Sequence, residues 1–298
     1  MLTRLRGGRG PRLVRCAAVA ALVATASLAS GQVAYAQIAA PPMTHEPVLL
    51  RLHPHVGDTL HTRLEQQTEV SGAQKAGAGS GSRAMTTSVT VSARTIVQAS
   101  RATTTTVLTI VDSAEVHSSA PNGAEMAKKA EHALRGQQLV LHLAEDGSVE
   151  SARDARGGTV PRDMAEAMAA MPAVFPHRAV SVGERWEREI SLPSAGALGA
   201  QGSALVRAKF RLDSLGRNGE LAYVSMRGEI VSEGNAEGLR LAGNITGAMR
   251  LDRVRGWMTD SRFSVLIRSL FTPPTGSSIA PMQFVTKLTQ HLRTMDKR

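Results

Sequence analysis

Four histidines near the front of the sequence have the spacing that most suggests chemistry: His45, His53, His55 and His61. The pair His53-Pro54-His55 could present two imidazoles to a divalent metal ion. No acidic residue stands at a matching spacing, and no H-E-x-x-H pattern occurs. We therefore expect these histidines to be surface residues and predict no metal site. A metal-dependent hydrolase using His53 and His55 is kept only as a third alternative.

Two carboxylates follow glycines in similar contexts, Val56-Gly57-Asp58 and Val182-Gly183-Glu184. Together they could form a paired-carboxylate site. Each also sits where a turn is expected, and there it could accept hydrogen bonds from nearby backbone N–H groups, which is the interpretation we favour. The glycine run at 77–82 matches no phosphate-binding pattern, and no G-x-S-x-G elbow occurs. We predict that the protein is not an enzyme.

Large apolar side chains are the remaining candidates for a binding site. Met164, Met168 and Met171 form one stripe of a predicted helix at 159–171, and adaptable methionines could contact an acyl chain. Trp186 and Trp257 could line a ligand cavity. Ordinary packing also explains all five residues and is the interpretation we favour: the methionines as a helix-on-sheet core, and the tryptophans as core anchors at strand starts.

The first 36 residues are typical of an export signal. A basic start is followed by an apolar core over 16–29 and by Ala34-Tyr35-Ala36, a small-x-small cleavage site. We expect cleavage near Ala36/Gln37 and a mature protein in the periplasm or outside the cell. Cys16, the single cysteine of the chain, lies in the leader, so the mature protein should have no disulfide and no thiolate site.

The formal charge of +10 overstates the basic character of the mature protein. The leader takes five of the 35 basic residues and none of the 25 acidic ones, which leaves 30 against 25, an excess of +5. Scattered charge of this size is typical of a solvated surface, and aromatic residues are too few for base stacking. We predict no nucleic-acid partner, and no transmembrane segment because the mature sequence has no long apolar run.

Alternating apolar and polar residues dominate the mature sequence and predict antiparallel strands with one wet face. The clearest example is 206–212, and Asp146-Gly147 and Asn218-Gly219 are hairpin signals. A helix-compatible run covers 121–134, Gly243 and Gly247 are expected bends in a long strand, and 282–292 could be a strand or a short helix. The first strand is expected to start near Val48.

The chain also has the pattern of a duplication. The glycines Gly57 and Gly183 precede similar strand patterns, and the hairpin glycines Gly147 and Gly256 follow at corresponding places, offset by an insertion around 121–135. We predict a signal peptide (1–36), an extended lead-in (37–47) and a single β-rich domain (48–298). Within this domain, pseudo-repeats 48–158 and 176–272 would be joined by the helix at 159–171.

The phrase Phe175-Pro176, Val180, Val182-Gly183-Glu184 and Trp186 resembles a motif of exported, uncharacterised bacterial β-rich proteins, F-P-x-x-x-V-x-V-G-[DE]-x-W. The resemblance extends over nearly the whole mature chain and implies a fold but no activity. More distantly, the layout is similar to the LolA/LppX-like half-barrel of lipid or lipoprotein carriers. It implies a curved antiparallel sheet or half-barrel, built here from two related halves with one or two short covering helices.

These observations predict a mainly β, non-enzymatic protein of the cell envelope that binds an apolar ligand, a lipid or an acyl chain, on a curved sheet without a cofactor. The alternative is a structural or protein-interaction module that pairs a sheet edge with another envelope protein. The sequence leaves the ligand, the partner, sheet closure and the oligomeric state open.

Overall fold

The computed structural model describes residues 46–74, 83–158, 160, 173–192, 203–233, 239–272 and 281–295. The chain divides into two units, Met1–Met43 and Thr44–Arg298, and every described residue belongs to the second. The predicted leader and the predicted helix at 159–171, with Met164, Met168 and Met171, lie outside the described residues except for Val160.

The described part is mainly β, as the sequence predicts. One α-helix and one short 3-10 turn (Arg217–Gly219) accompany eleven strands. The elements are β1 (Thr59–Gln74), β2 (Arg83–Ser100), β3 (Thr104–Ser118), α1 (Gly123–Leu134), β4 (Gln138–Ala144), β5 (Val149–Asp154), β6 (Arg185–Leu192), β7 (Ser203–Gly216), β8 (Leu221–Glu233), β9 (Leu239–Asp252), β10 (Trp257–Phe271) and β11 (Met282–Met295).

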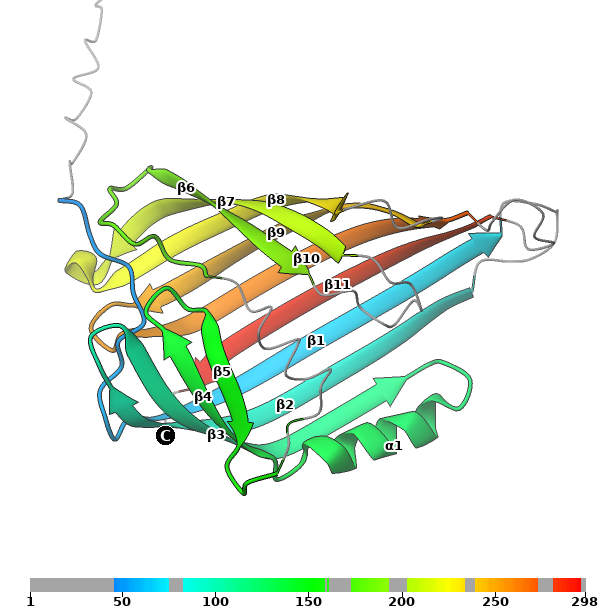
Figure 1. The fold of residues 1–298 in the computed structure, drawn as a ribbon, viewed down its shortest axis with the longest axis horizontal. Coiled ribbons are helices and arrows are strands. Elements are labelled where there is room, and N and C mark those ends of the chain that lie inside the picture. The colour runs from blue at the N-terminus through cyan, green and yellow to red at the C-terminus, as the bar shows by residue number, and fades with distance from the viewer. Residues whose placement is uncertain are drawn as a thin grey trace, which may run out of the picture. The chain divides into compact units, whose positions relative to one another are not determined.

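All eleven strands form one curved, unclosed antiparallel sheet (Figure 1). The spatial order is β5-β4-β3-β2-β1-β11-β10-β9-β8-β7-β6. Consecutive strands therefore pair with each other, except β5 with β6, and the first and last strands pair in the middle. This central seam joins β1 to β11 from His61↔Met295 to Gln74↔Met282. The edge strands are β5 and β6, which are close in the sequence but at opposite ends of the sheet.

The two faces of the sheet differ because directly opposed residues of an antiparallel sheet point to the same side. One side is apolar, and we call it the inward face; the other is the outward face. The register aligns a single inward-facing row across nine strands: Trp186, Phe210, Met226, Gly247, Phe263, Gln290, Gln66, Val89 and Val116. The alternation predicted for 206–212 is confirmed, since Val206, Ala208, Phe210 and Leu212 are all at most 1% exposed.

The buried core lies mainly on the flanks of the sheet. A large cluster covers β6–β9 together with Leu50 and Leu52, which precede β1, and Phe175 and Val180, which precede β6. A smaller cluster joins Val97, Val107, Leu143 and Val149 on β2–β5. Among the described residues, β11 has no buried side chain, and the buried side chains of β10 are Ser261 and Ser269. The centre of the inward face is therefore less covered than its sides.

The local predictions had mixed outcomes. Hairpins at Asp146-Gly147 and Asn218-Gly219 and the helix in 121–134 are confirmed. The expected first strand near Val48 is wrong, because Val48 makes only an isolated bridge to Val180 and the continuous strand starts at Thr59. The segment 282–292, left open between strand and helix, is strand.

The two glycines expected to bend a long strand have another role. β9 pairs through Gly243 and Gly247 with β8 and β10, and no register shift occurs at either position. A Cβ atom on Gly243 would lie 2.2 Å from the carbonyl oxygen of Leu266, and one on Gly247 would lie 2.4 Å from Cδ1 of Phe263. Both glycines therefore permit a close approach to β10.

Candidate functional site

The centre of the inward face is the strongest candidate for a ligand surface. Ten apolar side chains project from five adjacent strands and are each only partly buried. We call this set the inner apolar face: Leu64, Val70, Val89, Ile245, Phe263, Val265, Ile267, Phe284, Leu288 and Leu292. Gln66 and Gln290 lie opposite each other within it, so a pair of amides interrupts an otherwise apolar surface.

Trp186, one of the candidate ligand residues, is built into the core. It is 7% exposed and stacks on Phe210 with a ring-centroid distance of 5.7 Å. Its indole Nε1 donates to the carbonyl oxygen of Val174 at 2.8 Å, and Arg188 Nη2 donates to that of Phe175 at 2.6 Å. Trp186 therefore fastens the segment before β6 to the sheet, as the packing interpretation has it.

Trp257 begins β10 and is partly exposed. It packs against the large core cluster and against the smaller one, so it bridges the two. The structure brings Trp186 and Trp257 to the same large cluster. The other three candidates, Met164, Met168 and Met171, fall outside the described residues.

The two glycine–acid turns have the same geometry. Gly57 and Gly183 have φ of +89° and +88°, a left-handed conformation that suits glycine. Asp58 Oδ2 accepts from the N–H of His55 at 3.2 Å, and Glu184 Oε2 accepts from the N–H of Ser181 at 2.8 Å. Each carboxylate thus caps its own turn three residues back, as the turn interpretation predicts.

The Ser181 N–H lowers the pKa of Glu184, and the ion pair with Arg178 lowers it further. A carboxylate with a lowered pKa stabilises the fold fully above its unfolded pKa of about 4.3, and the contribution is lost as the pH falls through the folded value. We expect Glu184→Gln to lower Tm more at pH 7 than at pH 3. Thermal unfolding measures this, with the exposed Glu187→Gln as control. If the Tm difference between the wild type and Glu184→Gln is the same at both pH values, the lowered pKa of Glu184 does not contribute to stability.

His45 lies outside the described residues, and the other three histidines of the group have separate surroundings. His53 Nδ1 lies 3.3 Å from Ser100 Oγ, and the His55 ring lies 3.6 Å from Asp58 and is 71% exposed. His61 Nε2 is buried without a hydrogen-bond partner. In the part of the chain that the structure describes, no three His, Cys, Asp or Glu residues gather closely enough to hold a metal ion.

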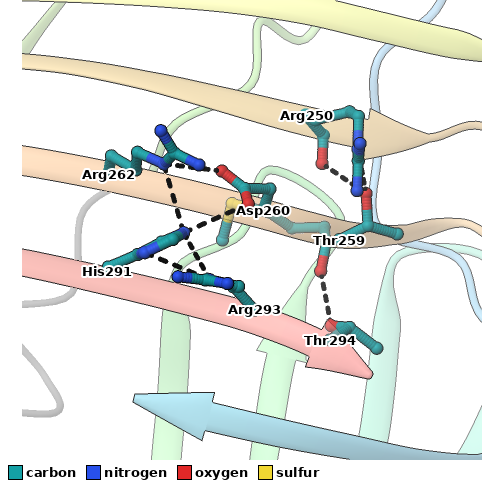
Figure 2. A network of polar contacts seen from close by, with 8 residues as sticks. Arg250, Thr259, Asp260, Arg262, His291, Arg293 and Thr294 are labelled. Atoms are coloured by element: carbon teal, nitrogen blue, oxygen red, sulfur yellow. Dashed lines mark hydrogen bonds and ion pairs between the residues drawn. The ribbon is translucent and has the colours of Figure 1, made fainter. Parts of the chain in front are cut away.

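A polar network on the outward face crosses from β10 to β11 (Figure 2). His291 Nε2 lies 3.2 Å from Asp260 Oδ2 and 3.2 Å from Arg262 Nε, and Arg293 Nε lies 3.0 Å from the same nitrogen. On β1, Glu65 lies opposite His291, and a 2.8 Å hydrogen bond from Arg63 is the main cause that lowers its pKa. The network adds charged contacts beside the central seam.

A hollow of about 1000 Å³ crosses the middle of β8, β9, β10, β11, β1 and β2. Each strand contributes three consecutive residues, of which the middle one faces inward and the outer two face outward. The hollow is therefore a groove on the outward face, walled by two rows of side chains. One wall is Ser225, Ala248, Arg262, His291, Glu65 and Thr90, and the other is Arg227, Thr246, Ser264, Thr289, Gln67 and Ser88. We call it the outer groove.

Sequence reasoning missed both the outer groove and the outward network. The alternating Arg207, Lys209 and Arg211 were a usable signal, because basic residues at every second position must share one face of a strand. The sequence contained no comparable signal for which charged residues of different strands would lie side by side.

None of the helices among the described residues combines the length and apolar character needed to cross a membrane.

No protein-family model matches this chain, and no curated protein matches it. Among solved structures, it is similar to DynF from the dynemicin biosynthesis pathway of Micromonospora chersina, at 9% identity and TM-score 0.23 over 85% of this chain and 88% of that one. An outer membrane channel from Pseudomonas putida also has 9% identity and TM-score 0.23, over 81% and 96%. Likenesses this weak carry no argument about function.

Proposed function

We propose that this is an exported, non-enzymatic protein of the cell envelope that binds an apolar ligand, such as a lipid acyl chain, on the inner apolar face. One observation carries the proposal: the central strands present a broad set of partly exposed apolar side chains, whereas the flanks bury theirs. Partly exposed apolar area on this scale is costly in water, and covering it with a ligand contributes about 25 cal/mol per Å².

The amide pair supports an amphiphilic ligand over a plain hydrocarbon. Gln66 and Gln290 stand opposite each other at the middle of the seam, with Leu64 and Leu292 on one side and Thr68 and Leu288 on the other. Their amides can donate to and accept from a carboxyl, ester or hydroxyl group. An acyl chain lying on the apolar side chains would then have its polar end at the seam.

Leu288→Gln is expected to weaken binding of a fluorescent fatty acid about five- to tenfold. The change places an amide where the acyl chain needs apolar surface, a loss of about 1 to 1.5 kcal/mol. Leu266→Gln is the matched control, because Leu266 is also partly exposed and is next to Val265, the β10 partner of Leu288, but faces outward. Equal binding by the two variants, or a purified protein without lipid in native mass spectrometry and without fatty-acid binding, contradicts the proposal.

Export and duplication belong to the same proposal. The leader pattern over 1–36 supports secretion, and the shared geometry of the Gly57 and Gly183 turns supports two related halves. The hydrogen bonds of the two turns also correspond, since Gly57 N–H donates to the carbonyl oxygen of Val97 on β2 and Gly183 N–H to that of Leu212 on β7, in each case the second strand after the turn. Mass determination of the mature N-terminus, expected at Gln37, tests the export step.

A structural or protein-interaction module remains the second candidate because β5 and β6 are open edges of the described sheet. Crosslinking in intact cells would then recover one dominant partner attached near an edge strand. If the crosslinks instead form on the inner apolar face, and none form at β5 or β6, the result favours the ligand-binding function.

A further inference from the structure

The outward face of β7–β11 is strongly basic. β7, β8 and β9 contribute the first set of outward basic side chains: Arg207, Lys209, Arg211, Arg227, Arg240 and Arg250. β10 and β11 contribute the second set: Arg262, Arg268, Lys287 and Arg293. Against these ten stand four acidic side chains that the structure describes on the same strands: Asp213, Glu229, Asp252 and Asp260.

The outward face of β1–β5 has the opposite balance. Its basic side chains are Arg63, Arg94 and Arg153, and its acidic ones are Glu65, Glu69, Asp112, Glu115 and Glu150. The scattered charge expected from the sequence is therefore sorted by the fold: the excess of basic residues gathers on the C-terminal strands. A face with one sign of charge concentrates ligands of the other sign.

The outer groove crosses this basic face on β8–β11 and continues over β1 and β2, where the charge balance is acidic. Six strands at a spacing of about 4.8 Å make it about 24 Å long, and its walls are two residues apart along each strand, about 7 Å. These dimensions suit one extended polymer chain. Arg227 and Arg262 are exposed on opposite walls, and Ser225, Thr246, Ser264 and Thr289 line the path between them. In the described part of the chain, Arg227 has no ion pair.

The floor of the groove excludes two kinds of occupant. Its backbone groups are already engaged in the ladders on both sides of β9, β10, β11 and β1, so an added peptide strand has no free edge to join. The walls have no Phe, Tyr or Trp side chain on which bases could stack, since the ring of Phe263 faces inward. A recessed path without large exposed apolar side chains also fits a polymer better than a bilayer surface.

We propose that the outer groove binds one chain of an acidic polysaccharide. The carboxylate groups of the sugar pair with Arg227 and Arg262, and its hydroxyl groups bond to the serine and threonine side chains of the walls. The single acidic wall residue, Glu65, is neutralised by its hydrogen bond with Arg63 and does not oppose this binding. The site is independent of the inner apolar face, which lies on the other side of the sheet.

Titration calorimetry with the full mature chain tests the proposal, with a hexamer of polygalacturonate as probe and neutral maltohexaose as reference. We expect the acidic hexamer to bind and the neutral one to bind at least tenfold more weakly. The double variant R227Q/R262Q should weaken binding of the acidic hexamer at least tenfold. The control R240Q/R268Q removes the same charge from the same face outside the groove and should cost threefold or less. Circular dichroism establishes that both variants fold.

Three results would overturn the proposal. Equal losses in the two double variants mean that the basic face attracts anions diffusely and that the groove has no part. If the wild type does not bind the polygalacturonate hexamer, the groove is not a site for acidic polysaccharide. If it binds maltohexaose as tightly as the acidic hexamer, the arginines do not determine binding. Binding to vesicles with 30% anionic phospholipid but not to the hexamer assigns the face to a membrane surface.

Discussion

Phe210→Ala should lower the free energy of unfolding by about 4 kcal/mol. Phe210 is 0% exposed, lies in the middle of β7 and stacks on Trp186 with an interplanar angle of 10°. Truncation removes the burial of the ring, leaves a cavity in the large core cluster and leaves Trp186 without its stacking partner. Urea unfolding followed by tryptophan fluorescence measures the effect, because Trp186 reports directly on this site.

Tyr223→Ala is the matched control for this prediction. Tyr223 is also aromatic and lies on the neighbouring strand β8, but it is 37% exposed and faces outward. We expect a loss below about 1 kcal/mol, as is usual for surface positions. Comparable losses in the two variants would mean that the inward side of β7 is not the stabilising core of the protein.

Gly243→Val is expected to cost about 3 kcal/mol or more, or to prevent folding. The new Cβ would lie 2.2 Å from the carbonyl oxygen of Leu266 and 3.1 Å from the Cα of Ile267. Both atoms are backbone, so relief requires β9 and β10 to separate and to lose ladder hydrogen bonds. The yield of folded protein and the midpoint of urea unfolding measure the effect.

Ala242→Val controls for the change of residue type. Ala242 is the preceding residue of the same strand and is exposed on the outward face, where a branched side chain suits a strand. We expect a change of about 0.5 kcal/mol or less. If both variants are equally stable, β9 and β10 are not as closely packed as the structure has them.

The accuracy of the predictions from sequence depended on the range of the interaction. Asn218-Gly219 was correctly identified as a hairpin because a tight turn needs residues that tolerate positive φ, and these have φ of 55° and 92°. Val48 was wrongly placed in the first strand because its apolar neighbours suggest a strand, whereas its actual partner is Val180, 132 positions away. The segment 282–292 pairs with the neighbouring β10 on one side, but its other partner is β1, where Gln74 pairs with Met282, 208 positions away, and the sequence alone did not assign it.

For the candidate site residues too, local contacts were predictable from the sequence and long-range contacts were not. The turn roles of Asp58 and Glu184 were predictable, since each carboxylate bonds to a backbone N–H three residues earlier. The environment of Trp186 was predicted only in kind, as a core anchor. Its contact with Phe210 depends on the register of β6 with β7.

The amino-acid sequence by itself determined the two-sided strands, the hairpins and the helix of 123–134, because side-chain alternation and turn conformation are properties of adjacent residues. Only the tertiary structure decided that the first and last strands meet in the centre, that apolar side chains there are left partly exposed, and that basic residues from five strands gather on one half of the outward face. These features depend on strand order and register, which are set by the burial of the whole sheet against its cores.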